Sequence, residues 1–154
     1  MNVALEINGR PVSIDCDPAT PLLDVLRNTL GLKGTRYGCG LEQCGTCMVL
    51  LDGEPAYSCA REVGTLSGHR IATVESIAGH PLIEAFLDEQ AGQCGYCLSG
   101  ILISATALLD RNRDPSRAEI VEALDRNLCR CGAHNRIIRA IQRAAAALRE
   151  GAPA

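Results

Sequence analysis

The feature that most constrains this chain is the stretch Gly38–Cys47, which reads GCGLEQCGTC. Its three cysteines are spaced C-x4-C-x2-C, and a fourth cysteine follows the last of them after twelve positions. The four residues of this first cysteine set are Cys39, Cys44, Cys47 and Cys59. The glycines between them permit positive φ and a close approach of the backbone to whatever the thiols hold. The stretch therefore predicts a loop that wraps around a bound metal group.

The spacing of the first cysteine set is that of a plant-type [2Fe–2S] centre. Two tetrahedral irons need two thiolates each, so one loop reaches both irons only if its backbone surrounds the cluster. Such a wrap also aims backbone N–H groups at the sulfurs, which offsets the negative charge of the cluster and tunes its potential. Two alternatives remain open. Structural zinc typically uses two short cysteine knuckles around one ion, and a disulfide framework requires an oxidising compartment.

A second group of four cysteines lies downstream as a C-x2-C pair and a C-x1-C pair. The residues of this second cysteine set are Cys94, Cys97, Cys129 and Cys131. Each pair lies at a predicted helix junction, and antiparallel helices would bring both pairs to one end of a bundle, where helix N-termini offer N–H groups to an anionic cluster. Zinc is the weaker alternative, because the single residue between the two cysteines of C-x1-C makes it difficult for both to bind one tetrahedral ion. We therefore expect a second [2Fe–2S] cluster.

Residues 1–76 are predicted to form a small α+β domain with a mixed sheet. Apolar residues alternate on both sides of an Asn-Gly turn, which predicts an N-terminal β-hairpin. Thr20 as N-cap and Pro21 at the first helical position predict a helix that ends at Gly31. Three further strands are predicted over residues 48–51, 56–59 and 71–74. The hairpin between the first two of them returns the fourth cysteine to the cluster loop.

Residues 77–154 are predicted to form an all-α, four-helix domain, because the apolar period changes from two to 3.6. A proline starts the first helix, and Ser116 with Glu119 forms a capping box for the third. The predicted helices cover residues 81–87, 98–109, 116–128 and 135–148. Residues 151–154 are expected to be a frayed end.

Composition excludes several classes of protein. The chain is 47% hydrophobic but only 3% aromatic, so its core must be aliphatic, and its net charge of −3 gives no indication of nucleic-acid binding. No apolar run approaches the roughly 20 residues of a membrane span, and no signal peptide is visible. Nine cysteines without an export signal favour metal ligation in a reducing, cytoplasmic compartment. Peripheral membrane or periplasmic association through a partner is the alternative. The ninth cysteine, Cys16, is predicted to be a small buried thiol.

The chain resembles the small iron–sulfur subunit of molybdenum hydroxylases, as in xanthine dehydrogenase and aldehyde oxidoreductase. The resemblance extends over nearly the whole chain, through GCGLEQCGTCMVLLDGEPAYSC, QCGYCLSGILISATALL and LCRCGAHNRIIRAI. It implies a β-grasp, plant-type ferredoxin-like domain followed by a four-helix bundle, with one [2Fe–2S] cluster in each. It also implies a large partner subunit that carries a molybdopterin-type molybdenum cofactor.

The resemblance further implies roles for particular residues. Electrons would pass from the molybdenum site to the second cysteine set, then to the first set, and then to an acceptor. Gln93 matches the glutamine that contacts the partner's pterin in the family; the alternative is an ordinary loop amide or helix-end cap. Histidine ligation by His69, His80 or His134 is disfavoured, because eight cysteines already complete two sets. No catalytic residue is expected in this chain, which has no recognisable site for activating an organic substrate.

Two departures from the common family pattern resemble one branch. Many members read C-T-P-G where this chain has C-L-S-G at 97–100, and many read C-R-C-T-G-Y where this chain has C-R-C-G-A-H at 129–134. Both departures resemble the isoquinoline 1-oxidoreductase and nicotinate dehydrogenase branch, which has no flavin subunit. The branch implies oxidation of an N-heteroaromatic compound or an aldehyde, with cytochrome c rather than flavin as the acceptor. The alternative is a free-standing ferredoxin-type electron carrier, which would not need the helical domain.

Overall fold

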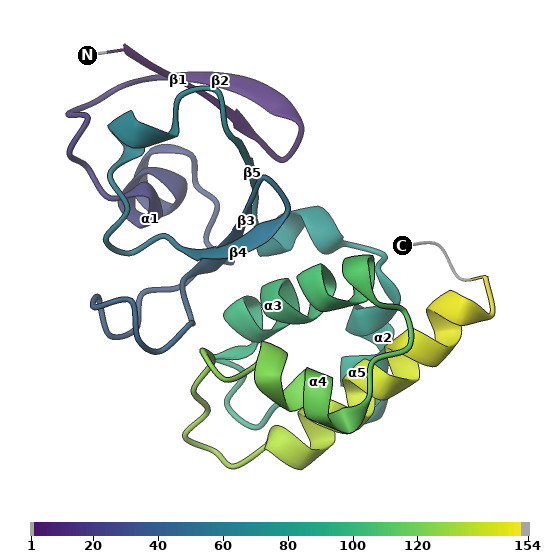
Figure 1. Ribbon diagram of the computed structural model, residues 1–154. Coiled ribbons are helices and arrows are strands. Elements are labelled where there is room, and N and C mark those ends of the chain that lie inside the picture. Colours follow the sequence, from purple (N-terminus) through teal and green to yellow (C-terminus); the bar gives the residue numbers. More distant parts are fainter. Residues whose placement is uncertain (1, 152–154) are drawn as a thin grey trace.

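A computed structural model describes residues 2–151, so residues 152–154 of the frayed end predicted over residues 151–154 lie outside the described part of the chain. Two parts lie next to each other (Figure 1). The strands and the short helix α1 form the N-terminal part, and helices α2 to α5 pack together as the C-terminal part. The predicted fold class, an α+β ferredoxin-like domain followed by a helical domain, is confirmed.

The N-terminal part contains one mixed sheet of order β2-β1-β5-β3-β4. Strand β1 (Asn2–Ile7) pairs antiparallel with β2 (Arg10–Asp15) and parallel with β5 (Arg70–Ala72). Strand β3 (Met48–Leu51) pairs antiparallel with β4 (Glu54–Tyr57) and with β5. The sheet therefore joins two hairpins through the last strand, as a β-grasp requires.

Both hairpins close through two residues with positive φ. Asn8 and Gly9 have φ of 51° and 74°, and Asp52 and Gly53 have φ of 52° and 88°. Positive φ at both central positions gives a type I′ turn, whose twist matches that of the flanking strands. The two predicted hairpins are confirmed, and the second one brings Cys59 back toward the loop that carries the other cysteines of the first set.

The helix after β2 is shorter and less regular than predicted. Helix α1 covers only Leu22–Asp24 and continues as a π-helical turn, η1 (Val25–Thr29). The wider turn is visible where the Leu30 N–H donates to the Val25 carbonyl at 3.0 Å. The predicted end at Gly31 is confirmed, because Gly31 adopts φ of 71°.

The prediction that Thr20 is the N-cap of this helix is wrong. Pro21 precedes the first turn with ψ of 137° and forms an isolated β-bridge with Glu62. The Thr20 carbonyl accepts a hydrogen bond from the Val63 N–H at 2.9 Å. Pairing with a segment some forty residues downstream therefore holds the chain extended where the local sequence favours a cap.

The C-terminal part contains the four predicted helices. In addition, short 3₁₀ turns flank strand β5 of the sheet. The helices are α2 (Pro81–Asp88), α3 (Leu98–Arg111), α4 (Arg117–Ala123) and α5 (His134–Arg149). The 3₁₀ turns are η2 (Val63–Leu66) and η3 (Val74–Ile77). The capping box of α4 is confirmed: the Ser116 hydroxyl accepts the Glu119 N–H at 3.3 Å, and the Glu119 carboxylate accepts the Ser116 N–H at 2.7 Å.

Strand β3 is buried on both faces, which explains its continuous apolar run. Val49 packs into the core between the sheet and α1, whereas Met48 and Leu50 face α3, where they contact Ile103 and Ala107. The two parts of the molecule therefore share an aliphatic interface in addition to their separate cores. This interface places the start of α3 against the loop of the first cysteine set.

Candidate functional site

The loop of the first cysteine set aims backbone N–H groups at sulfur. The Cys39 sulfur accepts hydrogen bonds from the N–H groups of Leu41 at 3.3 Å, Gln43 at 3.4 Å and Cys44 at 3.4 Å. Led by the Leu41 amide, these donors outweigh burial and lower the pKa of Cys39 to about 7. The Cys44 sulfur accepts in turn from the Cys39 N–H at 3.4 Å. The loop thus stabilises negative charge on sulfur before any metal is considered.

The other two cysteines of the first set lie deeper. Cys47 is 1% exposed and Cys59 is 8% exposed, in a small cluster with Leu23. Burial raises the pKa of Cys59 to about 11, and its hydrogen bond with the Cys47 thiol adds to the increase. The set therefore divides into an outer pair surrounded by amides and an inner pair surrounded by apolar groups. Metal ligation is the chemistry that would replace the protons on such buried thiols.

The second cysteine set also divides into two pairs. The sulfurs of Cys94 and Cys131 are 3.5 Å apart, although the residues are 37 positions apart in the chain. Cys97 and Cys129 are hydrogen-bonded to each other through their thiols, and burial raises the pKa of Cys97 to about 12. Two thiolates bound at about 2.3 Å to one tetrahedral ion lie about 3.8 Å apart, so the Cys94–Cys131 pair has close to the spacing of two ligands of one metal.

Amide donors surround the second set as they surround the first. The Cys94 sulfur accepts from the Tyr96 N–H at 3.5 Å, and this donor lowers the pKa of Cys94. Burial by itself would raise the pKa of the Cys129 thiol. Hydrogen bonds from backbone N–H groups, of which that of Ala133 contributes most, outweigh burial, so the pKa of Cys129 is lowered. These donors lie in the turns that lead into α3 and α5, as expected for a helix-end anion site.

The donor set fits a two-iron cluster in each place. All eight side chains are thiols, grouped as two pairs in each set, and a [2Fe–2S] cluster takes two thiolates per iron. Within residues 2–151, no three His, Cys, Asp or Glu side chains are arranged around a single metal ion. Glycine provides the remaining space, because an ideal Cβ on Gly38 would lie 2.6 Å from the Cys44 sulfur.

The two cysteine sets are connected by one direct hydrogen bond between backbones. The Leu128 N–H, next to Cys129, donates to the Cys44 carbonyl at 2.9 Å. Helix α3 packs tightly beside this bond, since an ideal Cβ on Gly100 would lie 1.8 Å from the Gly45 carbonyl oxygen. The structure therefore places the two sets in adjacent, contacting segments.

Side chains at the rim strengthen this junction. The Arg36 guanidinium donates to the Gly95 carbonyl at 2.6 Å and lies over the ring of Tyr96, 5.2 Å from its centroid. The Tyr96 hydroxyl donates to the Tyr37 carbonyl at 2.7 Å. Each contact joins a residue beside the first set to a residue inside the C-x2-C segment of the second set.

Gln93 lies on the exposed surface beside Cys94, which is also exposed. Its side chain lines an open groove of about 650 Å³ between the start of α3 and the end of α2, together with Phe86 and Arg136. Leu87 on the rim of this groove is 73% exposed. The apolar, unfilled surface next to the second set is the type of surface that a partner protein covers.

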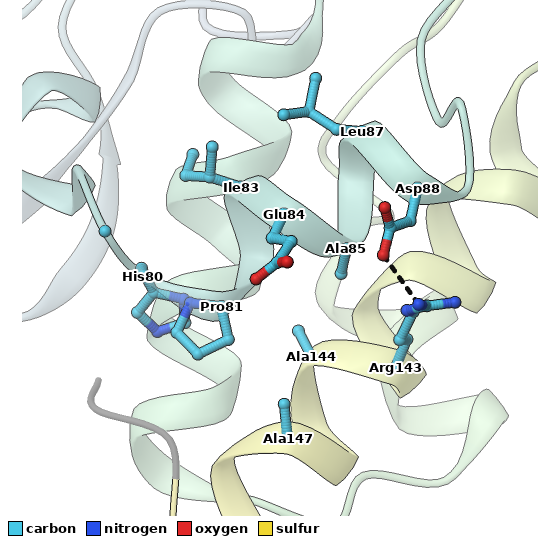
Figure 2. A pocket seen from close by; sticks show the side chains of 11 residues that line it. His80, Pro81, Ile83, Glu84, Ala85, Leu87, Asp88, Arg143, Ala144 and Ala147 are labelled. Carbon is cyan, nitrogen blue, oxygen red and sulfur yellow. Dashed lines mark ion pairs between the residues drawn. The ribbon is translucent and has the colours of Figure 1, made fainter.

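A second groove, of about 610 Å³, lies between α2 and α5 (Figure 2). Ala144 and Ala147 of α5 face Ala85 of α2 there, and Asp88 forms an ion pair with Arg143 at 2.7 Å. No cysteine is among the described residues that line it. The groove is a packing feature of two helices rather than a part of either cysteine set.

The three histidines lie outside both cysteine sets. His69, just before β5, pairs with Asp52 in the turn of the second hairpin at 2.6 Å. His80 caps α2, where its Nδ1 atom accepts the Leu82 N–H at 3.1 Å. His134 is the first residue of α5.

The sequence did not single out Asn127, which is 4% exposed and donates to the Gly45 carbonyl at 3.3 Å. The only signal for Asn127 was its position, since it closely precedes Cys129. The guanidinium of Arg126 lies 4.4 Å from the centroid of the Tyr57 ring and joins the turn after α4 to the sheet.

Comparison with known proteins gives two family matches that divide the chain. Residues 5–70 match the family described as 2Fe-2S iron-sulfur cluster binding domain, and residues 73–142 match the family described as [2Fe-2S] binding domain. Along the described chain, no helix is both long enough and apolar enough to span a membrane.

Relatives match over nearly their full length. The chain is 49% identical to one subunit of the nicotinate dehydrogenase of Pseudomonas putida, over 93% of this chain and 94% of that protein. It is 47% identical to the alpha subunit of the isoquinoline 1-oxidoreductase of Brevundimonas diminuta, over 90% of this chain and 94% of that protein.

Solved structures that superpose on this chain come from the same kind of enzyme as these relatives. A chain of quinoline 2-oxidoreductase from Pseudomonas putida 86 superposes with a TM-score of 0.93 and 38% identity, over 99% of this chain and 98% of that one. Aldehyde oxidoreductase from Desulfovibrio gigas superposes with a TM-score of 0.92 and 35% identity, over 99% of this chain but only 18% of that longer one. The chain therefore belongs to the small [2Fe–2S] subunits of the molybdenum hydroxylase family, in the branch that contains nicotinate dehydrogenase and isoquinoline 1-oxidoreductase.

Proposed function

We propose that this chain is the electron-transfer subunit of a molybdenum hydroxylase and that its eight paired cysteines hold two [2Fe–2S] clusters. Each cluster supplies a site that accepts and releases one electron. The ligands of the first cluster are Cys39, Cys44, Cys47 and Cys59, and those of the second are Cys94, Cys97, Cys129 and Cys131. The observation that carries the proposal is the direct hydrogen bond from the Leu128 N–H to the Cys44 carbonyl, which joins the two sets.

The surface around the second cysteine set supports a direction for electron transfer through the chain. Cys94 is exposed, and Gln93 lines an apolar groove beside it. We therefore assign this surface to the large, molybdopterin-binding partner subunit, with the Gln93 carboxamide as a hydrogen-bonding group for the pterin. The second set then receives electrons and passes them to the first set, whose outer pair lies closer to an acceptor. The amide donors on both sets would tune the two potentials.

The relatives support a class of substrate. Nicotinate dehydrogenase, isoquinoline 1-oxidoreductase and quinoline 2-oxidoreductase are named for N-heteroaromatic compounds. We assign such a compound, or an aldehyde, to the partner subunit, and cytochrome c rather than flavin as the acceptor. Thiol ligation of this kind is suited to a reducing compartment, and we assign the assembly to the cytoplasm.

The test is to purify the chain with the subunits that accompany it and to reduce the complex with a candidate N-heteroaromatic substrate. Two distinct [2Fe–2S] EPR signals should develop, with two irons and two sulfides for each cluster. A large subunit that contains molybdenum and pterin should co-elute on size exclusion. A monomeric chain with both clusters would instead favour a free-standing ferredoxin-type carrier, and bound zinc would contradict both functions.

A further inference from the structure

Asn127 is a buried polar residue between α4 and Cys129 that neither cysteine set uses as a ligand. Its side chain is 4% exposed, and its Nδ2 group donates to the Gly45 carbonyl at 3.3 Å. Its Oδ1 atom is buried and has no hydrogen-bond partner within the described residues. Because a buried acceptor without a partner lowers stability, packing alone does not favour an asparagine at this position. The donor half of the carboxamide is the part that makes a contact.

The contact of Asn127 forms one half of a two-bond clamp. The next residue, Leu128, donates its N–H to the Cys44 carbonyl at 2.9 Å. Two successive residues of the segment before Cys129 thus bind two successive carbonyls in the loop of the first set. The approach is close, because an ideal Cβ on Gly45 would lie 2.3 Å from the Arg126 carbonyl oxygen and 2.6 Å from Asn127 Nδ2.

The clamp joins a residue of one cysteine set to a neighbour of the other. Cys44 belongs to the first set, and Leu128 is bonded to Cys129 of the second. A single hydrogen bond therefore closes the gap between the two backbones. The bond persists only while the two segments keep their register, and the Asn127 carboxamide fixes that register at the adjacent carbonyl.

We propose that Asn127 is a positioning residue for electron exchange between the two clusters, an inference that rests on the function proposed above. With a cluster held by each cysteine set, the exchange would move one electron, so that one cluster is oxidised and the other reduced, with no bond formed or broken. Asn127 contributes by holding Gly45, so that the Cys44 carbonyl stays bound to the Leu128 N–H. Without that contact the segments separate and the electron crosses a longer gap.

The test compares Asn127→Leu, which keeps the side-chain shape but removes the donor, with the wild-type complex. A laser flash injects one electron per molecule, and the subsequent equilibration between the two clusters is followed by their distinct spectra. The variant should retain both EPR signals and its iron content, while equilibration becomes severalfold slower and magnetic coupling between the reduced clusters weakens. Asn112→Leu is the matched control: Asn112 donates to Glu119 at 3.1 Å, away from both sets, and its loss should leave exchange unchanged.

A second variant, Asn127→Ser, retains a polar group but is too short to reach Gly45, and it should slow exchange in the same way. Unchanged exchange in either cluster-loaded variant overturns the proposal. Loss of a cluster in both variants also overturns it, because Asn127 would then be a folding residue. Since the electron is injected by light, no substrate is needed. Absence of exchange in the wild type would refute the proposed function itself, which separates the two failures.

Discussion

At the scale of single residues, cysteines of similar sequence context have opposite environments. Amide donors lower the pKa of Cys39 and of Cys94, whereas burial raises the pKa of Cys59 and of Cys97. Each set thus combines sulfurs that hold charge readily with sulfurs shielded from water. A cluster bound in this way has one solvent-facing side, which is suited to electron entry or exit, and one protected side.

Cys94→Ser should remove the cluster of the second set and leave the first cluster in place, because the two sets occupy separate segments. Serine does not supply the thiolate that pairs with Cys131 at 3.5 Å. EPR of the dithionite-reduced complex should lose one of two signals, with iron content halved. Cys16→Ser is the control, because it replaces a cysteine outside both sets, and it should keep both EPR signals. Loss of both signals in C94S would mean that the sets are not independent.

His80 gives the fold a defined pH dependence. The residue is 6% exposed, and burial lowers its pKa below the ordinary 6.5, while the Asp110 carboxylate only partly opposes this. The unfolded chain therefore binds the proton more tightly than the folded chain does. The stabilising contribution is complete above about pH 6.5 and is lost as the pH falls from 6.5 toward the folded-state pKa.

His80→Asn should flatten this dependence, because asparagine can cap α2 but does not titrate. The measurement is the thermal midpoint by circular dichroism from pH 5 to pH 8, compared between wild type and variant. The difference between the two midpoints should narrow or reverse below pH 6.5 and be constant above it. If the midpoints of wild type and variant change in parallel with pH over the whole range, His80 does not control the loss of stability at acid pH.

At the scale of secondary-structure elements, α3 is the element that joins the two cysteine sets. Its first turn follows Cys97, and its Gly100 touches the backbone of the first loop at Gly45 and Thr46. The contact is between backbones, so neither partner can give way by rotating a side chain. Packing therefore favours glycine at position 100, despite the low helix propensity of glycine.

Gly100→Ala should separate α3 from the first loop. The new methyl group would lie 1.8 Å from the Gly45 carbonyl oxygen, and overpacking of this kind costs about 1–3 kcal/mol. Because the methyl group would meet backbone atoms, which cannot rotate away, the cost lies at the upper end of this range, and the gain in helix propensity, about 1 kcal/mol, offsets only part of it. Denaturant unfolding of the complex should show a lower midpoint, and iron should be released earlier. A midpoint equal to or above that of the wild type would contradict the contact.

At the scale of the whole molecule, apolar packing rather than surface charge holds the two parts together. Ile103 is fully buried against Met48 and Leu50 of β3. The ion pair between Arg111 and Glu54 also joins the parts, at 2.8 Å, but its two side chains are 57% and 65% exposed. Solvent and salt screen such a pair, so its contribution is small.

Two substitutions separate these contributions. Ile103→Ala should lower the free energy of unfolding by about 2–5 kcal/mol, because it leaves a cavity between α3 and the sheet. Arg111→Ala should lower it by less than about 1 kcal/mol. Chemical denaturation of both variants at low and high salt checks the comparison. If R111A proves the more damaging, the junction is electrostatic and the order of effects is reversed.

The sequence alone determined the features whose physics is local. The C-x4-C-x2-C spacing sets the loop of the first cysteine set, an Asn-Gly turn sets a hairpin, and a Ser116–Glu119 capping box sets the start of α4, because each acts within a few residues. Tertiary structure decided the rest. Pro21 pairs with Glu62 in place of the predicted cap at Thr20, Gly100 packs on Gly45, and Asn127 and Leu128 reach the loop of Cys44. Those partners are some forty to more than eighty positions apart, so no local rule predicts them. Folding of the N-terminal part brings Pro21 to Glu62, and packing of the helical part against the sheet, chiefly through α3, brings the other three pairs together.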